Sequence, residues 1–209
     1  MNIYEFTISY FYFYSNCRLL FMEKNLKQVK SDCLKVVLYG PESSGKTTLS
    51  RDLAKYYNTI WIEEFAREYL QEKWNKENKT CELNDMLPIA IGQIKLENEF
   101  CKKANKILFC DTDLLETKVY SQTYYNGFCD PVLEKYALEN KYDLYILTDI
   151  DIPWIKDDLR DRPNNRKEMF LAFKEALIKY NRPYILVSGN LRNRMQIAIF
   201  EIDKLLSRN

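Results

Sequence analysis

The sequence predicts an α/β domain with a five-stranded parallel sheet flanked by helices. Three observations support this fold class. Short apolar runs alternate with stretches of helical periodicity from residue 35 onward, which is typical of strands and crossover helices in a parallel sheet. A glycine-containing loop separates the first apolar run from the first helical stretch. The length of 209 residues suits a single domain with a sizeable core.

That loop, residues 40–47, has the sequence GPESSGKT and follows the apolar run 36–39. Glycines let backbone N–H groups turn inward around a phosphate, a lysine reaches the β- and γ-phosphates, and a hydroxyl holds Mg²⁺. Lys46 and Thr47 have the last two roles, and the following helix directs its positive end at the same anion. The order strand, loop, helix predicts a P-loop NTPase of the mononucleotide-kinase type with ATP and Mg²⁺ as cofactors. The expected nucleotide contacts are Gly40, Glu42, Ser43, Ser44, Gly45, Lys46, Thr47 and Thr48.

The remaining elements follow from apolar runs and helical periodicity. Residues 34–209 are expected to form the kinase-type domain, and residues 1–33 are interpreted as an N-terminal extension that can lie outside the fold, with Met1 or Met22 as the start. Strands are expected at residues 36–39, 59–63, 107–110, 144–148 and 184–187. Helices are expected at residues 47–57, 65–74, 85–105, 116–125, 131–140, 167–180 and 192–206.

Composition excludes several classes of function. The 31 basic and 30 acidic side chains nearly cancel, so the chain lacks the basic surface of most nucleic-acid-binding proteins. It contains no histidine, which excludes Ser-His hydrolases and leaves a carboxylate as any general base. The six cysteines form no C-x-x-C pair, which favours a reduced, cytoplasmic protein. The apolar stretch within residues 1–21 is interrupted before membrane-spanning length, so no membrane partner is expected, whereas a homo-oligomer stays open.

Carboxylates follow two of the predicted strands, at the end where parallel sheets bind their ligands. Asp111 and Asp113 come directly after the strand 107–110, and either could support Mg²⁺ together with Thr47. The alternative for Asp113 is a helix N-cap, because a helical stretch follows it. Glu64 follows the second strand and would orient and deprotonate an acceptor hydroxyl. Its alternative is a charge that complements the dipole of the next helix.

Arginines near these carboxylates are candidate phosphate ligands. Arg67, one turn into the helix after the second strand, would bind a substrate or form a surface ion pair. Arg160, Arg162 and Arg166 lie in a charged segment after the fourth strand, and their spacing favours a lid over the transferred phosphoryl group. The alternative is a solvated loop. Trp154, which precedes this segment, would stack on a planar ligand or pack in the core.

Several motifs, in the same order, resemble the ribosylnicotinamide kinase domain of NadR-type proteins, a P-loop family. The resemblance extends over residues 35–206 and implies MgATP-dependent phosphorylation of the 5′-hydroxyl of nicotinamide riboside to nicotinamide mononucleotide. Besides the loop, the motifs are EFAREY at 64–69, IAIGQ at 89–93, DTD at 111–113, PW at 153–154 and DLR at 158–160. The resemblance implies catalytic roles for Lys46, Glu64, Asp111 and Arg160, and substrate contacts from Glu64, Arg67, Asp113, Trp154 and Asp158.

Two other functions stay open at this point. A P-loop ATPase that regulates or binds a partner would need no acceptor pocket, so Glu64, Trp154 and the arginine-rich segment favour a kinase over it. A kinase for a different nucleoside is the other alternative. It stays open because Leu191 occupies a position where the resemblance leads us to expect tyrosine in some relatives.

Overall fold

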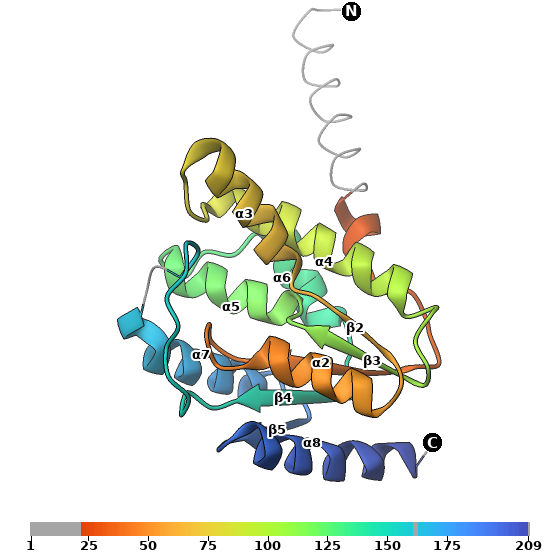
Figure 1. Cartoon of the computed structure of the whole chain (residues 1–209). Coiled ribbons are helices and arrows are strands. Elements are labelled where there is room, and N and C mark those ends of the chain that lie inside the picture. The colour runs from red at the N-terminus through yellow and green to blue at the C-terminus, as the bar shows by residue number, and fades with distance from the viewer. Residues whose placement is uncertain (1–21, 161–162, 209) are drawn as a thin grey trace, which may run out of the picture.

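The computed structural model describes residues 22–160 and 163–208 (Figure 1). It contains a five-stranded sheet in the order β2-β3-β1-β4-β5, and all neighbouring strands are parallel. The predicted fold class is therefore confirmed. The strands are β1 (Leu34–Tyr39), β2 (Ile60–Ile62), β3 (Ile107–Asp111), β4 (Leu144–Thr148) and β5 (Tyr184–Val187).

Helices cover both faces of the sheet (Figure 1). They are α2 (Lys46–Tyr56), α3 (Phe65–Glu77), α4 (Met86–Phe100), α5 (Leu114–Tyr124), α6 (Pro131–Glu139), α7 (Arg166–Lys179) and α8 (Leu191–Leu206). Two short 3₁₀ helices, η1 (Leu83–Asp85) and η2 (Pro163–Asn165), precede α4 and α7.

Two predicted helix ends are wrong, and local backbone geometry explains both. The helix predicted over 65–74 continues to Glu77, where Asn78 adopts a left-handed φ of 53° and donates its backbone N–H to Trp74. Such a left-handed residue ends a helix by satisfying one of its last carbonyls. The helix predicted over 85–105 ends at Phe100, because the next residues turn back into β3.

The core follows from the alternation of side chains along the buried strands. All six residues of β1 are buried. Val36 and Leu38 pack against α2 and α8, whereas Val37 and Tyr39 pack against α5 and α7. A strand covered on both faces needs such a continuous apolar run, which is typical of parallel sheets. The core thereby fixes the carboxyl end of β1, where the glycine-containing loop begins.

Residues 22–33 lie against the domain, although the sequence assigned them to an extension. Leu26 is fully buried among apolar side chains of α4, α5 and α6. The side-chain amide of Asn140 donates a hydrogen bond to the Leu26 carbonyl at 3.1 Å. The remainder of the predicted extension, residues 1–21, lies outside the described residues. Within the described ranges, no helix is long and apolar enough to cross a membrane.

Candidate active site

The loop between β1 and α2 depends on glycine at its first position. Gly40 has a φ of 140°, and a Cβ there would lie 2.7 Å from the Thr148 hydroxyl on β4. Any larger residue would therefore clash with the neighbouring strand. Ser43 and Gly45 also have positive φ values, 55° and 87°, which curl the loop before α2 begins. Backbone N–H groups in such a curled loop form a cradle for an anion.

Lys46 is the buried cation of this loop, with 7% of its surface exposed. Its ammonium donates to the carbonyls of Gly40 at 2.6 Å and Pro41 at 3.2 Å. It also lies 3.2 Å from the carboxylate of Glu116. Burial lowers the pKa of Lys46, but Glu116 and the neighbouring carboxylates Glu64 and Asp111 outweigh this effect and raise it overall. The lysine therefore stays charged, as a phosphate ligand must.

Thr47 and Asp111 meet across the loop. The Thr47 hydroxyl donates to Asp111 Oδ2 at 2.5 Å, and the other oxygen, Oδ1, is buried without a hydrogen-bond partner among the described residues. The pKa of Asp111 is raised to about 7, chiefly by burial and also by the nearby Glu64 carboxylate, against the opposing effects of Lys46 and the Thr47 hydrogen bond. A hydroxyl beside an unsatisfied carboxylate oxygen fits the donor set that P-loop proteins offer to Mg²⁺. The described residues contain no cluster of three His, Cys, Asp or Glu side chains that could hold a metal alone.

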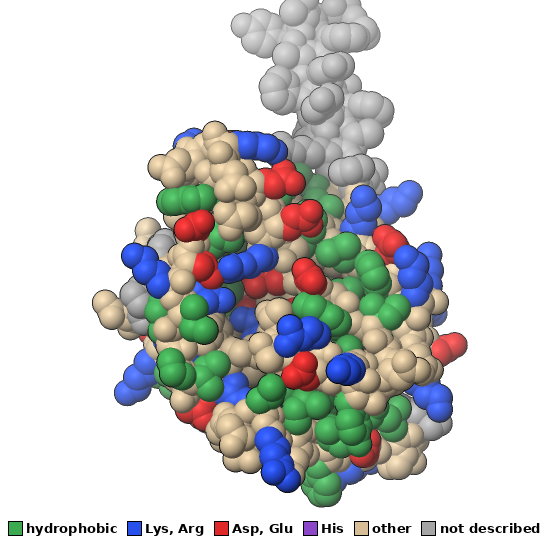
Figure 2. Space-filling model, viewed as in Figure 1, with side chains coloured by type: hydrophobic (Ala, Val, Ile, Leu, Met, Phe, Trp, Pro, Cys, Tyr) green, Lys and Arg blue, Asp and Glu red, His purple; other side chains and the backbone are tan. Residues whose placement is uncertain are grey.

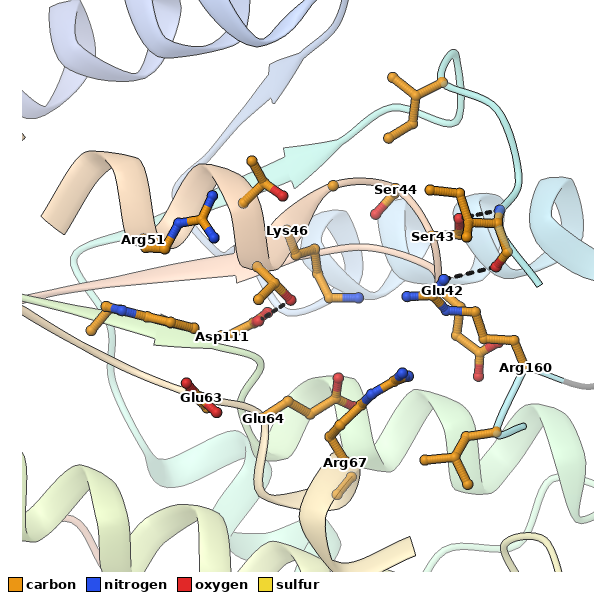
Figure 3. Close-up of a pocket in the computed structure, with 18 of the residues that line it drawn as sticks. Glu42, Ser43, Ser44, Lys46, Arg51, Glu63, Glu64, Arg67, Asp111 and Arg160 are labelled. Atoms are coloured by element: carbon orange, nitrogen blue, oxygen red, sulfur yellow. Dashed lines mark hydrogen bonds between the residues drawn. The ribbon is translucent and has the colours of Figure 1, made fainter. Parts of the chain in front are cut away.

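Glu64 lies at the junction of β2 and α3, and its side chain extends toward the Lys46 ammonium (Figure 3). A buried glutamine holds this junction. Gln93 on α4 accepts a hydrogen bond from the Phe65 backbone N–H at 2.8 Å and donates to the Asp111 carbonyl at 3.4 Å. Gln93 therefore links the backbone of the β2–α3 junction, next to Glu64, to the backbone at the end of β3, a role that sequence reasoning did not assign to it.

A cavity of about 630 Å³ lies between the loop, the β2–α3 junction, the end of β3 and the segment after β4. Figure 2 shows the hollow with basic and acidic side chains around it. Eleven predicted site residues line it, and Arg51, Trp61 and Glu63 were not predicted. The eleven are Glu42, Ser43, Ser44, Gly45, Lys46, Thr47, Thr48, Glu64, Arg67, Asp111 and Arg160.

The segment after β4 lies at the mouth of this cavity, where ion pairs that share one carboxylate hold it. Arg67 donates to Asp157 at 2.8 Å, and Arg160 lies 3.0 Å from the same carboxylate. Arg166 donates to the Ser43 carbonyl at 3.1 Å, so it supports the loop from behind. Two of the three predicted lid arginines thus lie near the loop, and Arg162 lies outside the described residues.

Three predicted substrate contacts do not line the cavity. Asp113 is fully buried and accepts hydrogen bonds from the Glu116 backbone N–H at 2.9 Å and the Tyr145 hydroxyl at 2.7 Å. It is the N-cap of α5, the alternative that the sequence left open. Thr112, between the two aspartates, has a left-handed φ of 74°. This turn of the backbone directs the side chain of Asp113 away from that of Asp111.

Trp154 and Asp158 also point elsewhere. The Trp154 ring packs against the Arg166 guanidinium, 5.6 Å from the ring centroid, and is not part of the cavity lining. Asp158 is exposed, and its neighbour Asp157 makes the contacts with the arginines instead. The segment after β4 has no regular structure, so its contacts decide which of two adjacent side chains faces the cavity.

Arg194 was missed by sequence reasoning. It is 3% exposed and donates to the carbonyls of Ser44 at 2.5 Å, Gly189 at 2.9 Å and Asp149 at 3.1 Å. It also pairs with the Asp151 carboxylate. The arginine therefore ties the loop to the ends of β4 and β5. Its signal in the sequence was its position on α8, four residues before the first of the buried apolar side chains on the same face.

A smaller pocket of about 90 Å³ adjoins the cavity on the far side of Glu64. It lies between α3, α4 and α5 and shares four lining residues with the cavity: Glu42, Glu64, Ala66 and Leu70. Apolar and aromatic side chains dominate the remainder. The apolar and aromatic ones include Met86, Ile89, Tyr120 and Tyr124. The polar ones are Gln93, Thr112, Glu116 and Thr117.

These features agree with the family to which the sequence is related. The AAA_28 family model, described as an AAA domain, matches residues 35–194, which is more than half of the chain. The chain belongs to the AAA_28 family. The match includes the loop, β2 to β5, all of β1 except its first residue, and Arg194.

Curated relatives of this AAA_28 domain include two proteins named "Trifunctional NAD biosynthesis/regulator protein NadR". The protein from Escherichia coli strain K12 is 32% identical over 154 residues, 73% of this chain and 37% of its own length. The protein from Salmonella typhimurium strain LT2 is 34% identical over 125 residues, 60% of this chain and 30% of its own length. The chain thus spans about a third of these relatives. The resemblance to NadR-type proteins is confirmed.

Solved structures similar to the AAA_28 domain include a NadR protein in complex with NR, with a TM-score of 0.69 and 25% identity over 83% of this chain and 50% of that one. A NadR protein in complex with NAD and AMP-PNP has the same TM-score, and the match covers 49% of that protein's chain. Deoxyadenosine kinase from M. mycoides and thymidylate kinase from Ehrlichia chaffeensis each have a TM-score of 0.61, at 14% and 16% identity. These two support the fold alone, that of P-loop kinases.

Proposed function

We propose that this chain is an ATP-dependent kinase that phosphorylates the 5′-hydroxyl of nicotinamide riboside and yields nicotinamide mononucleotide. The observation that carries the proposal is the arrangement within one cavity. The phosphate-binding loop with Lys46 forms one wall, and the Glu64 carboxylate extends from the opposite wall toward it (Figure 3). A bare ATPase needs no pocket for an acceptor, whereas here a second, smaller pocket adjoins Glu64. Similarity to a NadR protein in complex with NR over 83% of the chain supports this acceptor.

The residues suit direct in-line transfer from ATP to the acceptor. The loop N–H groups and Lys46 hold the phosphates, and Glu64 orients the acceptor hydroxyl and takes its proton. A bond forms between that oxygen and the γ-phosphorus while the bond from the γ-phosphorus to the bridging oxygen of ADP breaks. Arg160 and Arg67, at the mouth of the cavity, neutralise charge on the transferred group.

Thr47 and Asp111 would hold Mg²⁺ in this scheme. The donor set fits, because the Thr47 hydroxyl lies beside a buried Asp111 oxygen that has no hydrogen-bond partner among the described residues. When bound, Mg²⁺ supplies charge neutralisation between the β- and γ-phosphates. Mg²⁺ is usually held in proteins by only one or two protein ligands, so Thr47 and Asp111 would suffice.

An acceptor screen tests the proposal. The purified chain is incubated with ATP and Mg²⁺ and a panel of ribosides that includes nicotinamide riboside, adenosine and cytidine, and both ADP and the phosphorylated product are quantified. We expect nicotinamide mononucleotide as the main product and ADP release that depends on the acceptor. Equal ADP release without any acceptor would indicate an ATPase instead. Preferential conversion of another riboside would assign a different acceptor.

A further inference from the structure

The small pocket beside Glu64 differs from the cavity in the charge of its walls. Its described lining residues include three carboxylates, and no lysine or arginine is among them. The cavity, by contrast, is lined by four basic side chains, Lys46, Arg51, Arg67 and Arg160, in addition to the four carboxylates of Glu42, Glu63, Glu64 and Asp111. Its cations suit phosphates. The small pocket, with its carboxylates, is unsuited to a phosphate and favours a ligand with a positive charge.

The carboxylates of the small pocket come from three separate segments and converge on one aromatic side chain. Glu42 belongs to the loop, Glu64 to the β2–α3 junction and Glu116 to α5. Burial raises the pKa of the Tyr120 hydroxyl, and these three nearby carboxylates raise it further. Tyr120 thus lies in a strongly negative environment.

Glu116 is the most deeply placed of the three, with 1% of its surface exposed. Its Oε2 accepts a hydrogen bond from the Gly40 backbone N–H at 3.3 Å, whereas Oε1 has no hydrogen-bond partner among the described residues. The Lys46 ammonium at 3.2 Å is its nearest charge partner. Burial raises the pKa of Glu116 well above its ordinary value, and Glu64 and Asp111 add to the rise while Lys46 opposes it. A cation in the pocket would relieve this repulsion between carboxylates.

The shape of the pocket favours a flat ring. Its volume of about 90 Å³ is several times the space that one water molecule requires. The rings of Tyr120 and Tyr124 lie 5.4 Å apart at 52° on one side, and Met86 and Ile89 on α4 also line the pocket. An aromatic face attracts a cation placed over it, in addition to the apolar contact that it offers to a ring.

We propose that this pocket binds the heterocyclic ring of the acceptor nucleoside, and that Glu116 and Tyr120 select a ring that carries a positive charge. The inference rests on the proposed function, because it concerns the same acceptor. The pyridinium of nicotinamide riboside has this charge, and the common nucleobases are neutral. A neutral ring would displace water from the pocket without adding a positive charge beside its carboxylates, which gives discrimination as well as attraction.

The test compares two acceptors that differ in ring charge but share the ribose hydroxyl. These are nicotinamide riboside and its reduced dihydropyridine form, which is neutral. For the unaltered chain we expect kcat/KM to favour the cationic form by about tenfold or more, since one charge pair in a partly buried site contributes at least 1.4 kcal/mol. Glu116→Gln should lower this preference about tenfold.

The ratio of the two kcat/KM values isolates the selectivity from general damage, because both acceptors use the same Lys46 and the same ATP. Glu68→Gln, an exposed carboxylate on α3 outside both compartments, is the matched control and should leave the ratio unchanged. An equal fall for both acceptors in Glu116→Gln would overturn the inference and leave the proposed function intact. So would the absence of a preference in the unaltered chain, a result that requires no variant. Failure to phosphorylate either acceptor would contradict the proposed function itself.

Discussion

The cavity and the small pocket share a wall at Glu64 but differ in what they can bind. The cavity is wide, and its lining has four basic side chains together with four carboxylates, whereas the lining of the narrow pocket has three carboxylates, two tyrosines and no lysine or arginine. Glu64 therefore lies where a phosphate donor on one side would meet an acceptor on the other. In the scheme that we propose, the cations of one compartment bind the phosphates, the carboxylates of the other select the ring, and Glu64 at the boundary takes the transferred proton.

The two compartments also differ in how they are held. The loop is fixed by bonds to its backbone carbonyls, from Arg194 to Ser44 and from Arg166 to Ser43. The shared wall depends on side-chain packing and on Gln93, which binds the Phe65 backbone. We expect damage to the first support to weaken nucleotide binding, and damage to the second to affect the acceptor side.

The largest effect is expected from Lys46→Ala, which removes the cation of the wide compartment. Phosphoryl transfer should fall by about 10³-fold or more, because charge stabilisation dominates this chemistry. Circular dichroism and thermal unfolding should show a folded protein. Lys55→Ala, an exposed lysine on the same helix, is the control and should retain full activity. Substantial activity in Lys46→Ala would remove the basis for assigning the phosphates to this compartment.

Glu64→Gln should have the next largest effect, since it removes the proton acceptor but keeps the shape of the shared wall. We expect kcat to fall about 10²- to 10³-fold, as is usual for a lost general base. The affinity for ATP, measured by equilibrium titration, should stay within about twofold, because Glu64 does not hold the phosphates in our scheme. Equal losses in kcat and in ATP affinity would show that Glu64 is structural.

Arg194→Lys should act on the wide compartment alone. A lysine keeps the charge but cannot make the four contacts that the guanidinium makes with Ser44, Gly189, Asp149 and Asp151. We expect KM for ATP to rise about tenfold and the free energy of unfolding to fall by about 2 kcal/mol. The preference for a cationic acceptor should not change. A change in that preference would mean that the compartments are not independent.

The smallest effect on activity is expected from Gly92→Ala, which disturbs the support of the shared wall. A Cβ at Gly92 would lie 2.2 Å from the Phe65 ring, so the ring must move. Overpacking of this kind costs about 1 to 3 kcal/mol of unfolding free energy, and the displaced junction should raise KM for the acceptor a few-fold. Lys95→Ala, at an exposed position on the same helix, is the control. An unchanged acceptor KM in Gly92→Ala would show that Phe65 does not position Glu64.

The parts that sequence predicted best are those that depend on contiguous residues. The loop is a local motif whose glycines, lysine and threonine are all set by backbone geometry, and the alternating apolar runs predict the parallel sheet. Asp111 is also local, since it ends a buried strand. Asp113 shows the limit. The left-handed backbone of Thr112 turns the side chain of Asp113 into the core, and no spacing rule predicts that turn.

The parts that sequence missed depend on partners far along the chain. Arg194 and Ser44 are 150 residues apart in the sequence, and the buried ion pair of Lys35 and Glu97 joins residues that are 62 positions apart. Glu116 was given no role from the sequence, because only tertiary packing brings this helix residue to Lys46. The contacts of Asp157 rather than Asp158 with Arg67 likewise arise from tertiary packing of an irregular segment.

A structure of the chain with nicotinamide riboside and a non-hydrolysable ATP analogue tests the central claim most directly. We expect the triphosphate over the loop beside Lys46, the ring in the small pocket beside Tyr120 and Glu116, and the 5′-hydroxyl next to Glu64. A ring stacked on Trp154, with the small pocket empty, would contradict the separation of the two ligands by charge.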